Sequence, residues 1–427
     1  MKTYINPATE TWDELITRNI PNDPEVDRAV TAIIEQVKTD GDKALREMAA
    51  KFDHTDITDL RITDEEIAAG ITHVTPWVKN AILNAKANIE TFHRAQLPPT
   101  IEVETAPGVK CIQKPVAIDR VGLYIPGGQA PLFSTVLMLA VPASIAGCKE
   151  IILCTPQSAN HPIAPEILYA ASICGIKNIY RVGGAQAIAA MAFGTESIPK
   201  VDKIFGPGNR FVTKAKQQLT SVVAIDMPAG PSEVLVMADE TASPTYVAAD
   251  MLSQAEHGKD SQAILVCTEE SIAEETEKEV KRLSQLLSRS ESVEASLSHS
   301  RMIVFPERDT MIEFVNRYAP EHLIISMSQP WDIADKIRAA GSVFVGNYSP
   351  ESAGDYASGT NHTLPTATWA RSFSGVNIDS FMRKITFQEL SREGLAALAP
   401  TIITMADAEG LDAHALAVKV RTNDLNV

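Results

Sequence analysis

The sequence lacks the features that mark several specialised classes of protein. Its 427 residues contain no basic run, and 38 Lys and Arg against 54 Asp and Glu give a formal net charge of −16. Phosphate backbones are bound through clustered Lys and Arg, so nucleic acid is not expected as a partner. The five cysteines are odd in number and have no CxxC spacing. A disulfide framework or a thiolate zinc site is therefore not expected, and reduced cysteines favour a cytoplasmic location.

Long hydrophobic runs are also missing. The longest apolar stretch, residues 131–147, is interrupted by Ser134, Thr135, Pro142 and Ser144. It falls short of the ~20 residues that span a bilayer, and residues 1–16 have no signal-peptide core. We expect no membrane association. The content of 45% hydrophobic and 22% charged residues is typical of folded proteins.

The pattern of apolar residues predicts helices first and alternating elements later. Asn22-Asp23-Pro24 starts one helix, and a second is expected from Asp64 towards Phe92. From residue 120, short apolar strands alternate with helices in two successive blocks, which predicts a duplicated α/β module with parallel strands. The expected strands are 121–126, 150–155, 178–182 and 201–205, then 233–237, 262–267, 302–305, 323–325 and 342–345.

Two pairs of polar residues could carry chemistry near helix and strand ends. Gln254 and His257 are three residues apart, hence on one helix face, where imidazole and amide could bind a metal. The alternative is a polar helix end with Gly258 just beyond it. Glu321 and His322 precede a strand and could transfer protons. Adjacent residues of a regular strand point to opposite sides, so this pair converges only if the backbone departs from strand geometry.

Two further candidates lie in the last third of the chain. Asp355 and His362 belong to a Gly-rich segment, residues 347–365, that is too long for a plain connector. Its residues are equally typical of turns. Glu409 and His414 lie in the tail, where a histidine matters only if the tail docks on a site.

Glycine turns follow two of the expected strands. Gly183-Gly184-Ala185-Gln186 and Gly206-Pro207-Gly208-Asn209 each lead from a strand into a helix. Such turns expose amides that bind phosphate, and they also occur simply as tight connections. Neither is a full dinucleotide fingerprint, and no Walker, nucleophile-elbow or HExxH motif is present. Spacing alone therefore indicates an α/β enzyme with a His/Asp/Gln metal site as one option.

Taken together, these segments resemble histidinol dehydrogenases over nearly the whole chain. The matching stretches are 121–129 (VGLYIPGGQ), 183–196 (GGAQAIAAMAFGTE), 205–210 (FGPGNR), 225–237 (IDMPAGPSEVLVM), 252–258 (LSQAEHG), 319–324 (APEHLI), 346–347 (GN), 354–367 (GDYASGTNHTLPTA) and 392–399 (REGLAALA). The resemblance implies two successive NAD-dependent oxidations, from L-histidinol through the aldehyde to L-histidine, the last step of histidine biosynthesis.

The resemblance also implies roles for individual residues. His322 would take the alcohol proton while hydride passes to NAD, and Glu321 would activate the water that attacks the aldehyde. One zinc ion per subunit would be bound by Gln254, His257, Asp355 and His414, which also contact the substrate. The other substrate contacts would be Ser232, His322, His362 and Glu409, and the NAD contacts would be Tyr124, Gln186 and Asn209. The resemblance also implies a homodimer in which the tail crosses to the other subunit, so His414 would complete the site of the partner subunit.

The expected fold is α/β, with two successive incomplete Rossmann-like parallel-sheet modules, a helical N-terminal region and a helical C-terminal tail. Residues 1–22 would form an arm, 23–120 would pack with 233–377 as the first domain, 121–232 would contact NAD, and 378–427 would reach the partner subunit. One alternative function is a dehydrogenase of another polar alcohol on the same scaffold. Another is a metal- or nucleotide-binding protein without activity, against which the Glu321–His322 pair counts.

Overall fold

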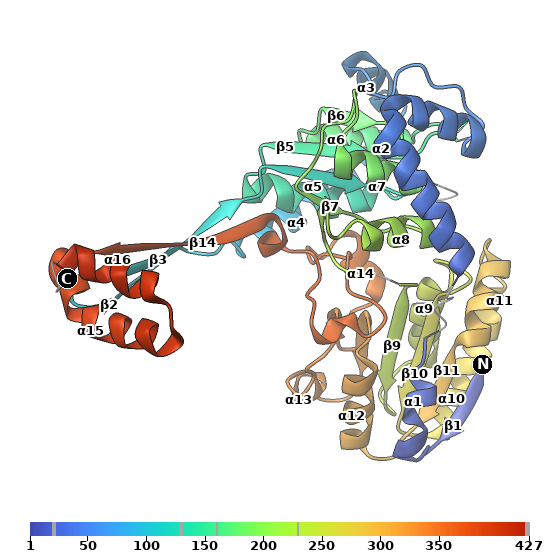
Figure 1. Ribbon diagram of the computed structural model, residues 1–427. Coiled ribbons are helices and arrows are strands. Elements are labelled where there is room, and N and C mark those ends of the chain that lie inside the picture. The colour runs from blue at the N-terminus through green and yellow to red at the C-terminus, as the bar shows by residue number, and fades with distance from the viewer. Residues whose placement is uncertain (19–22, 128–130, 159–160, 229, 423–427) are drawn as a thin grey trace. The chain divides into compact units, whose positions relative to one another are not determined.

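The computed structural model describes residues 1–18, 23–127, 131–158, 161–228 and 230–422 (Figure 1). Asn22, Gly128, Gln129 and Ala229 of the motifs above lie outside the described residues, as do other parts of the expected arm and tail (19–21 and 423–427). The chain forms two compact units. The larger is Met1–Gln96 with Ile118–Phe381, and the smaller is Leu97–Ala117 with Met382–Val427.

One parallel sheet of the larger unit is built from the first alternating block. Its strands are β4 (Arg120–Tyr124), β5 (Glu150–Cys154), β6 (Asn178–Tyr180), β7 (Lys203–Phe205) and β8 (Ala224–Ile225), and the helices of this block are α5 (Phe133–Ala146), α6 (Pro165–Ile173), α7 (Gly184–Phe193) and α8 (Arg210–Gln218). The strand order is β6-β5-β4-β7-β8, and all pairs are parallel. The order therefore reverses between β4 and β7, the kind of point where α/β sheets bind ligands.

The second block repeats this arrangement. Its strands are β9 (Glu233–Ala238), β10 (Gln262–Cys267), β11 (Arg301–Val304), β12 (His322–Ser326) and β13 (Ser342–Val345), and its helices are α9 (Pro244–Ala255), α10 (Glu270–Ser284), α11 (Ser290–His299), α12 (Arg308–Tyr318), α13 (Pro330–Ala334) and α14 (Glu351–Tyr356). The order β11-β10-β9-β12-β13 is again parallel and reverses between β9 and β12. The prediction of two successive parallel modules is confirmed. The arm adds an edge strand that was not predicted, β1 (Lys2–Ile5), and a short helix, α1 (Trp12–Leu15).

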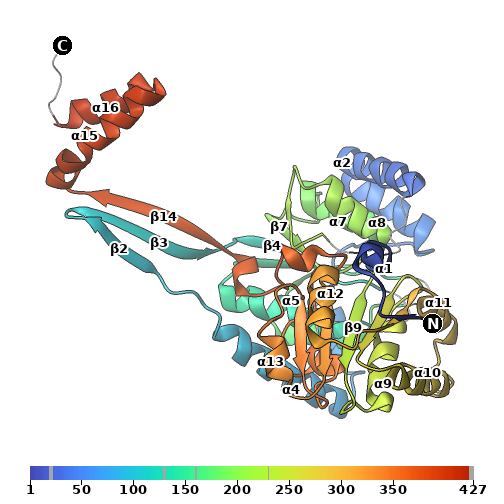
Figure 2. The same cartoon turned by 90° about the horizontal axis from the view of Figure 1, so that it is seen from below.

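The N-terminal helices pack differently from the prediction. They are α2 (Pro24–Phe52), α3 (Asp64–Ile71) and α4 (Pro76–Arg94); Thr75 caps the start of α4, so the helix expected from Asp64 to Phe92 is broken in two. The apolar face of α2 shares one buried cluster with α7 and α8 (Figures 1 and 2). The expected packing of this region with residues 233–377 is thus wrong for α2, because its buried apolar residues, from Val26 to Met48, pack with α7 and α8 of the first block instead.

The smaller unit is an antiparallel sheet followed by two helices. Its elements are β2 (Ile101–Ala106), β3 (Val109–Ala117), β14 (Met382–Leu390), α15 (Arg392–Glu409) and α16 (Asp412–Thr422), with strand order β14-β3-β2. The helical tail is confirmed for α15 and α16, but the tail begins with a strand. β2 and β14 escaped prediction because they are mostly exposed, and β3, which is mostly half-buried, likewise carries no run of apolar residues.

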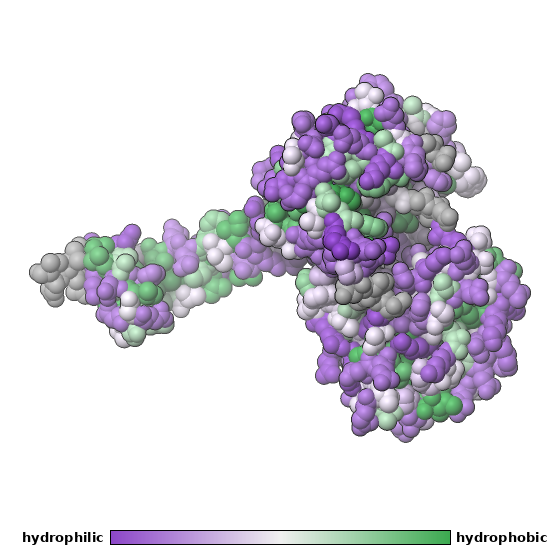
Figure 3. All heavy atoms as spheres, turned by 45° about the vertical axis from the view of Figure 1, so that its right-hand side comes forward, coloured by the Kyte–Doolittle hydropathy of each residue, from purple (hydrophilic) through white to green (hydrophobic). Residues whose placement is uncertain are grey.

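On the face of the larger unit seen in Figure 3, hydrophilic residues dominate and apolar residues are scattered among them. Among the described residues, no helix combines the length and the apolar character that crossing a bilayer requires.

Candidate active site

Glu321 and His322 converge at the start of β12. After α12 ends, Ala319 adopts a positive φ of 53°, so the chain turns sharply and only His322 belongs to the strand. The backbone N–H of Glu233 donates to Oε2 of Glu321 (2.8 Å), and its carbonyl accepts from Nδ1 of His322 (3.2 Å). Oε2 of Glu321 lies 3.7 Å from Nδ1 of His322. The departure from strand geometry that the pair needs is therefore present.

Three carboxylates surround the His322 ring. Besides Glu321, Oε1 of Glu351 lies 3.8 Å from Nδ1, and Oδ1 of Asp355 lies 3.6 Å from Nε2. Burial opposes the charged imidazolium, but the carboxylates of Glu351, Glu321 and Asp355 prevail and raise the pKa of His322 to about 10. Burial raises the pKa of Glu321 to about 8. Nε2 is buried and makes no hydrogen bond within the described part of the chain, which leaves it open to a ligand.

A candidate metal centre adjoins this pair. The ligand atoms of His257, Glu351 and Asp355 all lie within 4.8 Å of one another. Gln254 is fully buried on α9. With its amide turned, the side-chain nitrogen donates to Oε1 of Glu351 and the oxygen accepts from the N–H of Glu233 (3.2 Å). The imidazole of His257 and the two carboxylates are donor groups that metal ions accept. The residues present therefore fit a metal ion.

The segment expected to be a long loop contains the short helix α14. Glu351 and Asp355 are one turn apart on it, so both can reach the same centre. Glu351 was missed by the sequence reading, although its position four residues before Asp355 was a usable signal. Burial raises the pKa of Glu351 to about 8.

His362 and Ser232 are two further expected substrate contacts that lie in the larger unit. Nδ1 of His362 bonds the backbone carbonyl of Asp355 (2.9 Å), and Nε2 bonds Oγ1 of Thr135 on α5 (3.2 Å). Burial lowers the pKa of His362, which favours the neutral ring. Ser232 directly precedes Glu233 and is half-buried. The other two expected residues, Glu409 and His414, are exposed in the smaller unit, so they are not among the side chains that the larger unit gathers.

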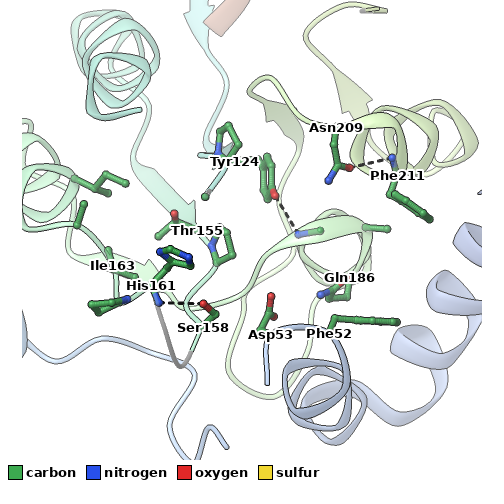
Figure 4. A pocket seen from close by; sticks show the side chains of 18 of the residues that line it. Phe52, Asp53, Tyr124, Thr155, Ser158, His161, Ile163, Gln186, Asn209 and Phe211 are labelled. Atoms are coloured by element: carbon green, nitrogen blue, oxygen red, sulfur yellow. Dashed lines mark hydrogen bonds between the residues drawn. The ribbon is translucent and has the colours of Figure 1, made fainter. Parts of the chain in front are cut away.

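A cavity of about 830 Å³ lies at the carboxyl ends of the first sheet (Figure 4). All three residues expected to contact NAD line it. Tyr124 ends β4, and its hydroxyl accepts a hydrogen bond from the N–H of Gly184 (3.0 Å). Asn209 caps α8 by accepting from Phe211 N (3.0 Å), and Gln186 lies in the first turn of α7. The lining also includes Phe52, Asp53, Thr155, Ser158 and His161, which sequence patterns did not single out.

Comparisons with known proteins point to one family. The family model described as histidinol dehydrogenase matches residues 16–422. The chain belongs to the histidinol dehydrogenase family. It is 54% identical over 427 residues to the histidinol dehydrogenase of Bacteroides fragilis, covering 100% of both chains. It is also 54% identical over 415 residues to the histidinol dehydrogenase of Salmonella typhimurium, and this match covers 96% of this chain and 95% of the relative.

A solved structure of a histidinol dehydrogenase is also similar. The crystal structure from Elizabethkingia anophelis has a TM-score of 0.97 and 52% identity, and the match covers 100% of this chain and 99% of that one. The predicted family is confirmed, and with it an oxidoreductase that fits the final step of histidine biosynthesis. A dehydrogenase of another polar alcohol is not favoured.

Proposed function

We propose that the protein oxidises L-histidinol to L-histidine in two successive NAD-dependent steps, through the aldehyde, with one zinc ion per subunit. The observation that carries the proposal is the convergence of Glu321 and His322 beside the His257–Glu351–Asp355 cluster, in a chain of the histidinol dehydrogenase family. A binding protein has no need of two proton-transfer groups at one point.

The proposed zinc ligands are Gln254, His257 and Asp355 of one subunit and His414 of another. Nitrogen and oxygen donors of this kind suit zinc. Bound zinc would hold the imidazole and the amine of L-histidinol. The support in this chain is the cluster of His257, Glu351 and Asp355, whose ligand atoms all lie within 4.8 Å of one another.

His322 is the proposed base for both oxidations. The carbonyl of Glu233 can only accept, so Nδ1 of His322 carries the proton and Nε2 is the atom that takes the proton of the substrate alcohol. Glu321, held by the N–H of Glu233, would remove a proton from the water that attacks the aldehyde. NAD, when bound, supplies the hydride acceptor. Ser232, His362 and Glu409 are the remaining proposed substrate contacts.

The proposed NAD site is the cavity lined by Tyr124, Gln186 and Asn209 in the 121–232 module. Its volume is within the range of ligand pockets, roughly 300–1,000 Å³, and it adjoins the reversal of strand order between β4 and β7. Burial raises the pKa of Tyr124 to about 12, so its hydroxyl stays protonated and can donate to a phosphate or ribose oxygen.

The protein is proposed to act as a homodimer in which the smaller unit reaches the partner subunit. Apolar side chains that remain exposed on this unit support an interface there: Ile101, Val103, Ile385, Phe387, Met405 and Leu416. A cytoplasmic location is proposed as well, and all five cysteines, which are free, agree with it.

Counting NADH tests the proposal directly. Zinc-loaded protein with excess NAD should form two NADH per L-histidinol consumed, with L-histidine as the product. One NADH with release of the aldehyde would contradict the second oxidation and the role of Glu321. No NADH from L-histidinol, together with turnover of another polar alcohol, would overturn the substrate assignment.

A further inference from the structure

Thr135 is not one of the expected site residues, yet its side chain forms a hydrogen bond with one of them, His362. Thr135 lies in the first turn of α5, is 1% exposed, and is a polar residue of a mostly apolar, mostly buried helix. A helical threonine often bonds a carbonyl one turn back. Here Oγ1 lies 3.2 Å from Nε2 of His362 instead, which joins the first α/β module to the segment after α14.

The hydrogen bonds of His362 determine which ring nitrogen carries the proton. The carbonyl of Asp355, 2.9 Å from Nδ1, can only accept, so Nδ1 is the donor. The hydroxyl of Thr135 is the only group within hydrogen-bond distance of Nε2 among the described residues that can donate to it. Nε2 is then an acceptor, and the hydroxyl of Thr135 is its donor.

From this geometry we infer that Thr135 is a positioning residue for substrate binding, which acts by donating to Nε2 of His362 and holding that ring in one tautomer and one orientation. The inference rests on the proposed function, in which His362 contacts L-histidinol; both ring nitrogens are bonded within the protein, so this contact is made by the carbon edge or the face of the ring. Without the donor, the two-point restraint of the ring is reduced to the single bond with Asp355. Because this hydrogen bond is partly buried, water does not readily replace the lost partner.

Binding of L-histidinol to the zinc-loaded protein, measured by calorimetry without NAD, tests the inference. Thr135→Val keeps the shape of the side chain and removes the donor. The Kd for L-histidinol should rise about tenfold, which is the size expected for the loss of one buried hydrogen bond. The KM should rise by the same factor, with a smaller change in kcat, and the affinity for NAD should not change. Thr135→Ser retains the hydroxyl and should restore binding.

Thr363→Val is the matched control. Thr363 is also buried and adjoins His362, but its hydroxyl has no hydrogen-bond partner in the described part of the chain. Its substitution should leave the Kd close to that of the wild type. Equal Kd values for Thr135→Val and Thr363→Val would overturn the inference. So would a Thr135→Ser variant as weak as Thr135→Val, because packing rather than the hydroxyl would then be responsible.

Side-chain nitrogen NMR of the wild-type protein gives a test that needs no folded Thr135 variant. The signals of His362, identified by their loss in His362→Gln, should show a protonated Nδ1 and an unprotonated Nε2. A protonated Nε2 would overturn the inference. If instead the wild type shows this tautomer but does not bind L-histidinol, the proposed function fails while the hydrogen bond from Thr135 stands.

Discussion

The carbonyl oxygen of Glu233 accepts a hydrogen bond from Nδ1 of His322 (3.2 Å), at the point where the paired strands β9 and β12 begin. The N–H of the same residue binds Glu321 (2.8 Å). One peptide segment therefore sets both the tautomer of the proposed base and the orientation of the neighbouring carboxylate. Its own position is secured by the Glu233 side chain, which pairs with Nε of Arg18 at 2.7 Å.

The two candidate sites lie at opposite ends of the strands in their respective sheets. Tyr124 is the last residue of β4, so the cavity lies at the carboxyl ends, where α/β sheets usually bind ligands. Glu233 and His322 are the first residues of β9 and β12, so the proposed proton-transfer groups lie at the amino ends. The second module thus has the usual topology but a different site.

Replacing Arg18 by Met should destabilise the protein strongly. Glu233 is 1% exposed, and removal of one partner of a buried ion pair typically costs about 3–5 kcal/mol. Arg317→Met is the control, because Arg317 pairs with the exposed Asp13 and should cost about 1 kcal/mol or less. Urea unfolding measures both. Adding Glu233→Gln to Arg18→Met should recover part of the lost free energy of unfolding. Equal losses for Arg18→Met and Arg317→Met would show that the Arg18–Glu233 pair contributes little to stability.

Glu321→Gln should separate the two oxidations. The amide can still accept from the N–H of Glu233, but it cannot take a proton from water. We expect the second oxidation to slow by about 10²–10⁴-fold, the usual contribution of a general base, so that NADH per L-histidinol falls from two towards one. Glu313→Gln is the control, because Glu313 is exposed on α12, and this variant should still form two NADH per L-histidinol. Two NADH from Glu321→Gln at the normal rate would assign the water-activating role to another group.

His257→Ala should lose the metal. Its imidazole lies with Glu351 and Asp355 in the candidate centre, whereas His73 is exposed on the segment after α3. Elemental analysis of purified protein should find zinc in the wild type and in His73→Ala, and little in His257→Ala. Unchanged zinc in His257→Ala would place the metal elsewhere.

Zinc uptake should release protons and become tighter as the pH rises. Against the opposing effect of burial, the carboxylates of Glu351 and Glu321 raise the pKa of His322, and burial raises the pKa of Glu351, so at pH 7 the neighbouring His322 and Glu351 together hold at least one titratable proton in the metal-free protein. A cation beside them favours the deprotonated forms and displaces those protons. From pH 6 to 8 the affinity should rise about tenfold per pH unit for each proton released. Chelator competition measures this slope, and a flat profile would exclude coupling to these groups.

The sequence predicted the buried elements better than the exposed ones. Apolar runs such as 233–237 and 262–267 identified central strands, because strands covered on both faces read as continuous hydrophobic segments. β14 is exposed along almost its whole length and was missed for the opposite reason. Likewise, Glu351 enters the site through a short helix inside a Gly-rich segment, and the Thr135–His362 contact joins residues 227 positions apart. No local pattern encodes such a contact.

Mixing inactive subunits can show whether His414 acts across a dimer. His414→Ala alone and His322→Ala alone should each be nearly inactive. In a dimer of the two, one site has both defects and the other has neither, so random mixing should restore about a quarter of the wild-type activity. A mixture of His257→Ala and His322→Ala is the control and should restore none, because both residues belong to the same larger unit. If the mixture of His414→Ala and His322→Ala is as inactive as the control mixture, His414 serves its own subunit or no site at all. The proposal that the tail is exchanged between subunits must then be abandoned.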